Sequence, residues 1–149
     1  MPAEQAIRDL LKEFCLAMHK WAGDSHADYR RWRKDLKGGA LPTTHPYWIA
    51  VEDRKRDLRE IFCRYCTEWK SPGRSASFSV DDYDPEHFVV LDVTVRADTA
   101  TARVKQSEFP GKLEVAEYFL RRVKDEWRLE DRRRWVDLEG NVVQDWDSL

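Results

Sequence analysis

The stretch "LEVAEYFLRRVKDEWRLEDRRRWVD", residues 113–137, decides the fold because its side chains alternate with a period of two. That period predicts one strand over 113–124 and a second over 126–137. Only a short link around Lys124 and Asp125 separates them, and a link this short joins antiparallel neighbours. We therefore expect a β-hairpin whose closing strand carries three consecutive arginines.

The same period continues upstream of the hairpin. The segment "HFVVLDVTVR" (87–96) is rich in β-branched residues, and "TATARVKQ" (99–106) alternates small apolar with polar side chains. The links between these segments are equally short, so we expect a β-meander of four strands. A further short strand is expected near 77–80.

The first half of the chain has helical rather than strand periodicity. Residues 4–21 place apolar side chains on one face, and Gly23 with the two polar residues after it is expected to end that helix. A second helix is expected over 26–37 and a third over 46–65, where Pro46 suits a first turn. Three helices are therefore predicted before the sheet.

Helices that precede an antiparallel sheet predict an α+β fold in a single domain spanning residues 1–149. We divide it into a helical half (1–70), a sheet half (75–137) and an acidic tail (138–149), which "LEGN" (138–141) opens with a turn. A curved sheet with helices on its concave face would leave a cone that is open at one end.

Charge and composition restrict the classes of partner. The chain has 26 Lys and Arg against 28 Asp and Glu, a net charge of −2. Because nucleic-acid affinity depends on neutralising phosphates, no nucleic-acid partner is expected, although three arginines flank Trp32. Apolar runs long enough for a signal peptide or a membrane span are missing from the sequence, and three cysteines are too few for a disulfide framework. We expect a cytoplasmic protein without membrane contact.

Sequence motifs for metals, cofactors and catalysis are also missing. The pair Cys63 and Cys66 forms a CxxC, but it falls in the last turns of a predicted helix and lacks a second ligand pair. A redox pair belongs at a helix N-terminus, so we interpret both cysteines as structural. The four histidines are scattered. We therefore expect no cofactor, no metal and no catalytic residue.

Two strongly acidic stretches are candidate partner-binding surfaces. Both could instead be solvated segments, but acidic patches also accelerate and orient encounters with basic partners. An aromatic residue among acids either packs back onto the sheet or anchors an interface. The candidate partner-binding residues are Asp81, Asp82, Asp84, Glu86, Asp145, Trp146 and Asp147.

The interior of the cone offers an alternative, enzymatic site. A buried carboxylate beside tyrosine donors could abstract a proton next to a carbonyl group, and Asp92 or Asp131 could supply it. Strict alternation points Asp131 and Arg133 inward and Arg132 outward to solvent. The candidate pocket residues are Tyr29, Trp32, Tyr118, Asp131, Arg133 and Trp135.

Several stretches resemble the nuclear transport factor 2-like superfamily, and more narrowly its immunity-protein branch. The matching pieces are "DYDPEHFVVLDV" (82–93), "TARVKQSEFPGKLEVAEYFL" (101–120) and "EWRLEDRRRWVDLEGNVVQDW" (126–146). Weaker matches are "HPYW" (45–48) and "IFCRYCT" (61–67). The chain departs from the pattern at Val80-Asp81-Asp82, where prolines are expected.

The resemblance implies a cone-shaped fold and a non-enzymatic protein that binds and neutralises a cognate polymorphic toxin delivered between bacteria. It transfers no toxin-contact residues to this chain. The toxin domain is the expected partner, with a basic nuclease as one candidate, and the chain itself is expected to be a monomer or a homodimer. The alternative is a small-molecule-binding protein, or an isomerase or dehydratase, that uses the interior of the cone.

Overall fold

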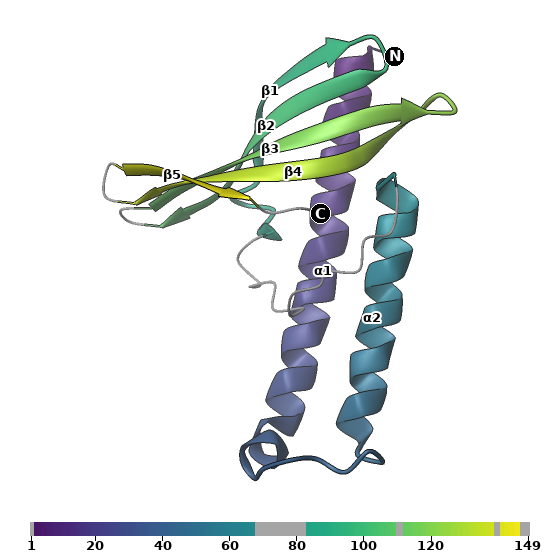
Figure 1. Cartoon of the computed structure of the whole chain (residues 1–149), viewed down its shortest axis with the longest axis vertical. Coiled ribbons are helices and arrows are strands. Elements are labelled where there is room, and N and C mark those ends of the chain that lie inside the picture. The colour runs from purple at the N-terminus through teal and green to yellow at the C-terminus, as the bar shows by residue number, and fades with distance from the viewer. Residues whose placement is uncertain (1, 68–82, 110–111, 139–140, 147–149) are drawn as a thin grey trace.

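The computed structural model describes the backbone of residues 2–67, 83–109, 112–138 and 141–146, and the side chains of residues 2–67, 83–105 and 115–133. Two helices precede an antiparallel sheet (Figure 1), which confirms the α+β class. The elements are α1 (Ala3–Lys37), α2 (Pro46–Tyr65), β1 (Val89–Arg96), β2 (Thr99–Phe109), β3 (Lys112–Val123), β4 (Glu126–Leu138) and β5 (Asn141–Trp146).

The sheet is a meander of five strands in chain order, β1-β2-β3-β4-β5. The predicted link between β3 and β4 is a two-residue turn in which Lys124 and Asp125 have φ values of 51° and 65°, as the tight turns of twisted hairpins require. The turn predicted at 138–141 is confirmed, because β4 ends at Leu138, which pairs with Asn141 at the start of the antiparallel strand β5. The acidic stretch after it was predicted as a tail, and this is wrong because residues 141–146 form β5. The short strand expected near 77–80 lies outside the described residues.

Helix α1 runs through the predicted break at Gly23, so the described chain has two helices where three were expected. An interior glycine costs a helix about 1 kcal/mol. Ion pairs on the next residue oppose that cost, because Asp24 contacts Lys20 at 3.1 Å and Arg54 of α2 at 3.3 Å. Contacts between helices therefore override the local break signal.

Helix α2 has the predicted bounds and a capping group at each end. The side chain of His45 accepts a hydrogen bond from the backbone N–H of Tyr47 at 3.0 Å, and Pro46 occupies the first turn. At the other end, Nη1 of Arg128 in β4 donates to the carbonyl oxygens of Cys63 and Arg64 at 2.9 and 3.2 Å. A cation beside the last carbonyl groups of a helix donates hydrogen bonds to acceptors that have no partner within the helix. It also interacts favourably with the negative end of the helix dipole.

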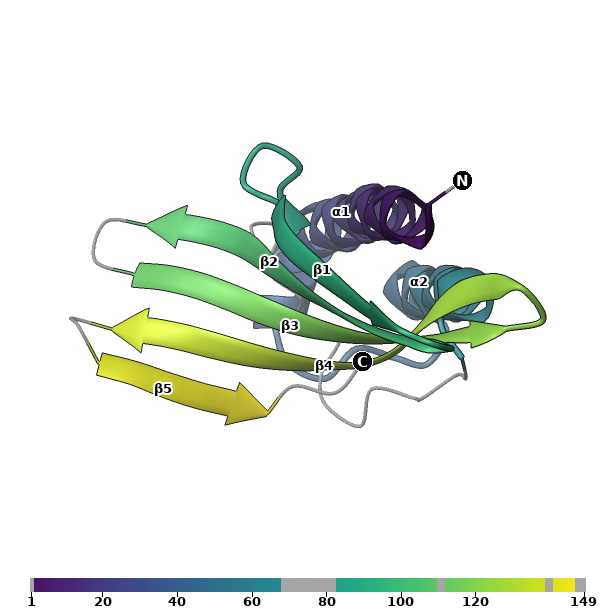
Figure 2. The ribbon, with the colours of Figure 1, turned by 90° about the horizontal axis from the view of Figure 1, so that it is seen from above.

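The core lies where the first half of α1 and the last turns of α2 meet the sheet. Its largest fully buried side chains are Ile7, Leu11, Phe14, Met18, Tyr83, Val104, Tyr118, Leu120 and Leu129. The helices lie on one face of the sheet (Figure 2), and α1 contacts β1 and β4 whereas α2 packs mainly against α1. The packing of helices on one face of the sheet thus agrees with the prediction, with two helices in place of the three expected.

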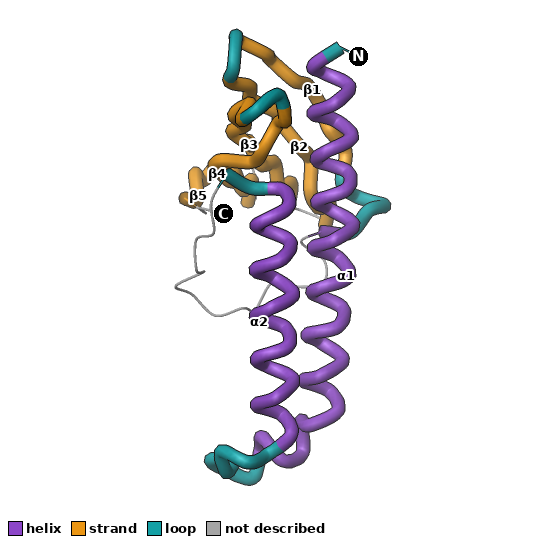
Figure 3. The backbone as a smooth tube through the Cα atoms, turned by 90° about the vertical axis from the view of Figure 1, so that its right-hand side faces the viewer, coloured by secondary structure: helices purple, strands orange, loops and turns teal. Residues whose placement is uncertain are grey.

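The helical hairpin extends well beyond the sheet (Figures 1 and 3). We call residues 23–57 the arm, because they lie between the last buried residue of α1, Ala22, and the first of α2, Leu58, and none of them is buried. Neither described helix is long and apolar enough to cross a bilayer. The fold thus consists of a packed body and an arm without a core of its own.

Candidate functional site

A β-bulge in β4 decides which arginine of the Arg132–Arg134 run enters the core. Phe119 pairs with Asp131 but its neighbour Leu120 pairs with Leu129, so β4 has one extra residue at this point. The extra residue reverses the alternation beyond it. Leu129 and Arg132 are both buried, with Arg132 only 4% exposed, whereas Arg133 is half-buried. The prediction that Arg133 points inward and Arg132 outward is therefore wrong.

Arg132 sits among tyrosines inside the body. Its Nη1 donates a hydrogen bond to the hydroxyl of Tyr83 at 2.6 Å. Its guanidinium lies 5.6 Å from the ring centre of Tyr83 and 5.9 Å from that of Tyr118, within the range of cation–π attraction. Burial raises the pKa of Tyr118 well above its ordinary value, although the charge of Arg132 opposes the shift. Tyr118 is therefore a neutral core phenol.

The candidate pocket residues do not converge. Tyr29 is exposed on the arm and Trp32 is half-buried there, whereas Tyr118 belongs to the core of the body. Arg133 places its guanidinium 5.6 Å from the ring centre of Phe119. The side chain of Asp131 accepts a hydrogen bond from the backbone N–H of Arg132 at 2.8 Å instead of pairing with Arg133. Trp135 lies in β4 opposite Val115, and its side chain is outside the described residues.

Asp92, the other candidate carboxylate, lies on the exterior. It forms an ion pair with Arg103 of the neighbouring strand. The hydrogen bond from Arg103 holds the pKa of Asp92 below its usual value. A general base of the predicted kind needs a raised pKa, so Asp92 lacks the property that the enzymatic alternative requires.

The candidate acidic residues are only partly described. Asp84 and Glu86 form a turn before β1, in which Oδ1 of Asp84 accepts from the N–H of Glu86 at 3.0 Å. Ligand atoms of these two residues and of His87 lie within 4.8 Å of one another, but the turn itself explains this approach and we assign no metal to it. Asp145 and Trp146 end β5. Asp81, Asp82 and Asp147 lie outside the described residues.

The cysteines of the CxxC differ in environment. Cys66 is buried where the chain leaves α2, whereas Cys63 is exposed. The third cysteine, Cys15, is buried in α1, and its thiol donates to the carbonyl oxygen of Tyr83 at 3.4 Å. Burial, with a contribution from Asp84, raises the pKa of Cys15 to about 12. The structural interpretation thus holds for Cys66 and does not describe Cys63.

Native protein should therefore expose one of its three cysteines to a thiol reagent at pH 8. Cys63 should react at once, because only an accessible thiolate attacks, and the other two should react only after unfolding in urea. A titration with Ellman's reagent checks this, and Cys63→Ser is the control. Rapid reaction of the Cys63→Ser variant would contradict the burial of Cys15 and Cys66.

An ionic cluster joins the two helices of the arm. Arg54 of α2 reaches Oδ2 of Asp24 and of Asp28 on α1 at 3.3 and 3.4 Å, and Oδ2 of Asp57 at 3.3 Å. The carbonyl oxygen of Arg54 also accepts from the indole N–H of Trp21 at 2.7 Å. Three carboxylates around one guanidinium replace the apolar contacts that join the helices in the body.

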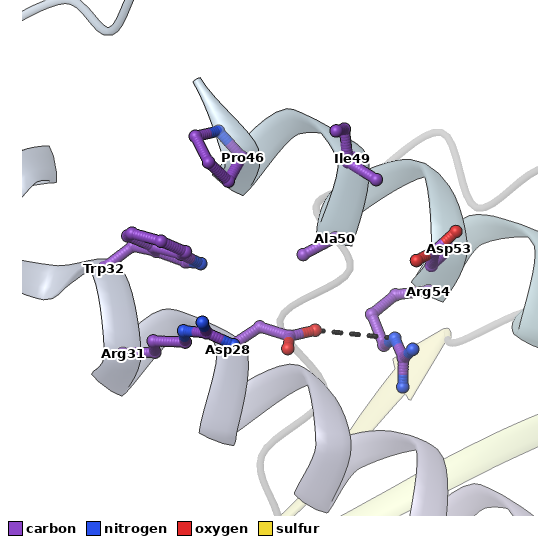
Figure 4. Close-up of a pocket in the computed structure, with 8 residues that line it drawn as sticks. All are labelled: Asp28, Arg31, Trp32, Pro46, Ile49, Ala50, Asp53 and Arg54. Carbon is purple, nitrogen blue, oxygen red and sulfur yellow. Dashed lines mark ion pairs between the residues drawn. The ribbon is translucent and has the colours of Figure 1, made fainter. Parts of the chain in front are cut away.

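A groove runs between the helices of the arm, with a cavity volume of about 330 Å³ (Figure 4). One side consists of residues of α1, Asp28, Arg31 and Trp32, and the other of residues of α2, Pro46, Ile49, Ala50, Asp53 and Arg54. The Asp28–Arg54 ion pair crosses between the helices. The guanidinium of Arg31 lies 4.9 Å from the ring centre of Trp32.

Sequence reasoning placed Trp32 among the candidates but missed the rest of the groove. A usable signal was present, because Asp28 continues the spacing of the apolar stripe of α1, and Arg54 falls between Val51 and Leu58 on the stripe of α2. Charged residues at stripe positions mark the part of a helix pair where an apolar core stops.

No family model, curated protein or solved structure matches this chain.

Proposed function

We propose that this chain is a non-enzymatic immunity protein, a variant of the nuclear transport factor 2-like fold that binds a cognate bacterial toxin and neutralises it by occlusion. The observation that carries the proposal is the arm. It has no buried residue, yet it presents Tyr29, Trp48 and Ile49 to solvent at 45%, 42% and 65% exposure. Large exposed apolar side chains with a polar surround are typical of protein interfaces.

The exposed apolar side chains of the sheet are less available for a partner. They lie on the edge strand β1, at Val89, Leu91 and Val95. The start of α1 covers part of this edge, because Arg8 donates from Nη1 to the carbonyl oxygen of Val90 at 3.1 Å. Covering an edge in this way opposes strand addition. The arm is therefore the better docking surface.

Charge is distributed unevenly between arm and body, which would orient a partner. The arm has 8 Lys and Arg against 6 Asp and Glu, a net +2, so the rest of the chain has 18 against 22, a net −4. Complementary fields increase the encounter rate and fix orientation more than they add affinity. A toxin that presents a basic surface to the body and an acidic segment to the arm would complement the net charge of each part.

The enzymatic alternative has less support. It required a desolvated carboxylate and a tyrosine converging in an open interior. The described interior between α1 and the sheet instead holds packed side chains, and its one buried charged residue is an arginine, Arg132, hydrogen-bonded to Tyr83. A small ligand would have to displace this packing.

Coexpression with a toxin domain encoded beside its gene should restore growth to cells that the toxin otherwise kills, and the two purified proteins should elute as one complex. In the same binding assay, Asp84→Asn combined with Asp145→Asn and Asp147→Asn should weaken affinity and flatten its salt dependence, whereas Asp125→Asn should not. Absence of rescue by a folded, well-expressed chain would refute the proposed function.

A further inference from the structure

The face by which each helix enters the core continues along the arm, beyond the end of the sheet (Figure 3). Tyr29 follows the buried Ala22 by seven residues, and Trp48 precedes the buried Phe62 by fourteen. Seven residues make nearly two helical turns, so a residue at such a spacing lies on the same side of its helix as the buried one. We call four arm residues at these spacings the core-side face: Tyr29, Leu36, Trp48 and Val51.

The core-side face is open and separate from the groove. Tyr29 and Trp48 are 45% and 42% exposed. The groove is lined from α1 by Asp28 and Arg31. Each residue turns a helix by about 100°, so Tyr29 lies on one side of Asp28 and Arg31 on the other. A partner could therefore contact this face without entering the groove.

The carboxylates that α1 contributes to the arm are directed away from the core-side face. In the arm, whose residues are all described, they are Asp24, Asp28 and Asp35. Asp24 and Asp28 pair with Arg54 of α2 at 3.3 and 3.4 Å. Oδ2 of Asp35 lies 2.8 Å from Nε2 of His45, which caps α2. All three side chains thus meet groups of α2 or of its cap.

The charged residues of α1 beside the core-side face are cations. Tyr29, Arg33 and Lys37 follow one another at intervals of four, so they form one ridge of the helix, and Arg30 and Lys34 belong to the next. All four cations are exposed, and none has an ion-pair partner among the described residues. Positive charge beside an apolar face, with no carboxylate of α1 to neutralise it, selects an acidic partner.

The shape of the core-side face suits a helix. Two residues from each helix of the hairpin form it, and the ridges of such a pair leave a channel into which a third helix can pack. Carboxylates one turn apart on that helix would match Arg33 and Lys37, which are also one turn apart. On the α2 side, Glu52 and Lys55 pair with each other at 3.2 Å and add no net charge.

We propose that the core-side face of the arm binds an acidic amphipathic helix of a partner protein. The apolar stripe of that helix packs on Tyr29 and Trp48, and its carboxylates pair with Arg33 and Lys37. This inference rests on the proposed function and names the element of the toxin that the arm receives. A nucleic acid fits less well, because the rest of the chain carries a net −4 that repels a long phosphate chain.

The test uses the full chain and a fluorescein-labelled peptide designed as an amphipathic helix, with leucines on one face and glutamates on the other. Two control peptides replace the glutamates with glutamine or the leucines with serine, and oligothymidine is the nucleic-acid probe. Trp48→Ser and Arg33→Glu alter the core-side face and its cationic ridge. Leu16→Ser and Lys12→Glu change an exposed apolar residue and an exposed cation on the body part of α1. Circular dichroism checks that all four variants fold, as expected for exposed positions.

Fluorescence anisotropy should show that the acidic peptide binds the native chain and that added salt weakens the binding. Trp48→Ser and Arg33→Glu should each weaken it about tenfold or more. Neither body variant should change affinity, and both control peptides should bind more weakly. Equal binding by native chain and face variants, no peptide binding, or oligothymidine binding that depends on Arg33 would each overturn the proposal. A dimer of the native chain that Trp48→Ser dissociates would assign the face to a second copy and would overturn it too.

Toxin rescue separates this inference from the proposed function. Failure of rescue with peptide binding intact would refute the immunity function and leave the core-side face standing as a binding surface. Full rescue by both Trp48→Ser and Arg33→Glu would refute the role of the face and leave the immunity function standing.

Discussion

Replacing Phe14 with alanine should lower the free energy of unfolding by about 3–5 kcal/mol. Phe14 is fully buried, and its ring centre lies 6.4 Å from that of Phe62, 6.0 Å from that of Tyr65 and 5.9 Å from that of Tyr83. It therefore joins α1 to α2 and to the segment before β1. Truncation removes apolar burial, leaves a cavity and breaks three aromatic contacts. Urea titration followed by circular dichroism measures the loss.

Leu16 is the matched control on the same helix. Its side chain is 51% exposed, so Leu16→Ala should change stability by no more than about 0.5 kcal/mol. Similar losses for the two variants would mean that α1 does not pack through the face that contains Phe14. A large loss for Leu16 alone would mean that the helix is rotated about its axis.

Arg132→Ala should cost about 2–4 kcal/mol, because it deletes a hydrogen bond from a charged donor and leaves the Tyr83 hydroxyl without that donor in the core. Arg133→Ala should cost about 1 kcal/mol or less, since this side chain is only half-buried and keeps access to solvent. The same urea titration measures both. Strict alternation without the bulge predicts the opposite order, so a larger loss for Arg133→Ala would contradict the register of β4.

Local periodicity was sufficient for β1 to β4 and for α2, whereas β5 was not predicted. The predicted strand over 126–137 is β4 (Glu126–Leu138), and the predicted helix over 46–65 is α2. Both depend on side-chain spacing within one segment and on short-range signals such as Pro46 and the Lys124-Asp125 turn. The predicted end of the helix at Gly23 was wrong. Contacts between helices, such as the ion pair of Asp24 with Arg54, oppose that local signal.

The candidate sites were harder to predict for the same reason. Tyr29 and Ile49 are exposed because the sheet covers only part of each helix. The spacing of residues within a helix does not show where that cover ends. Trp32 was expected to meet Tyr118 in one pocket, but it lies on the arm while Tyr118 lies in the body. An amphipathic stripe specifies which side of a helix is buried and leaves open where along the helix the burial ends.

By itself, the sequence determined that helices precede strands, the α+β class and the meander of β1 to β4, because each follows from periodicity and turn chemistry within a segment. The tertiary structure alone decided two things that matter for function. A one-residue bulge, settled by pairing between β3 and β4, sent Arg132 rather than Arg133 into the core. The end of the sheet along the helical hairpin left residues 23–57 as an arm without a core. Both outcomes arise from contacts between segments distant in the chain, for which single-segment patterns carry no information.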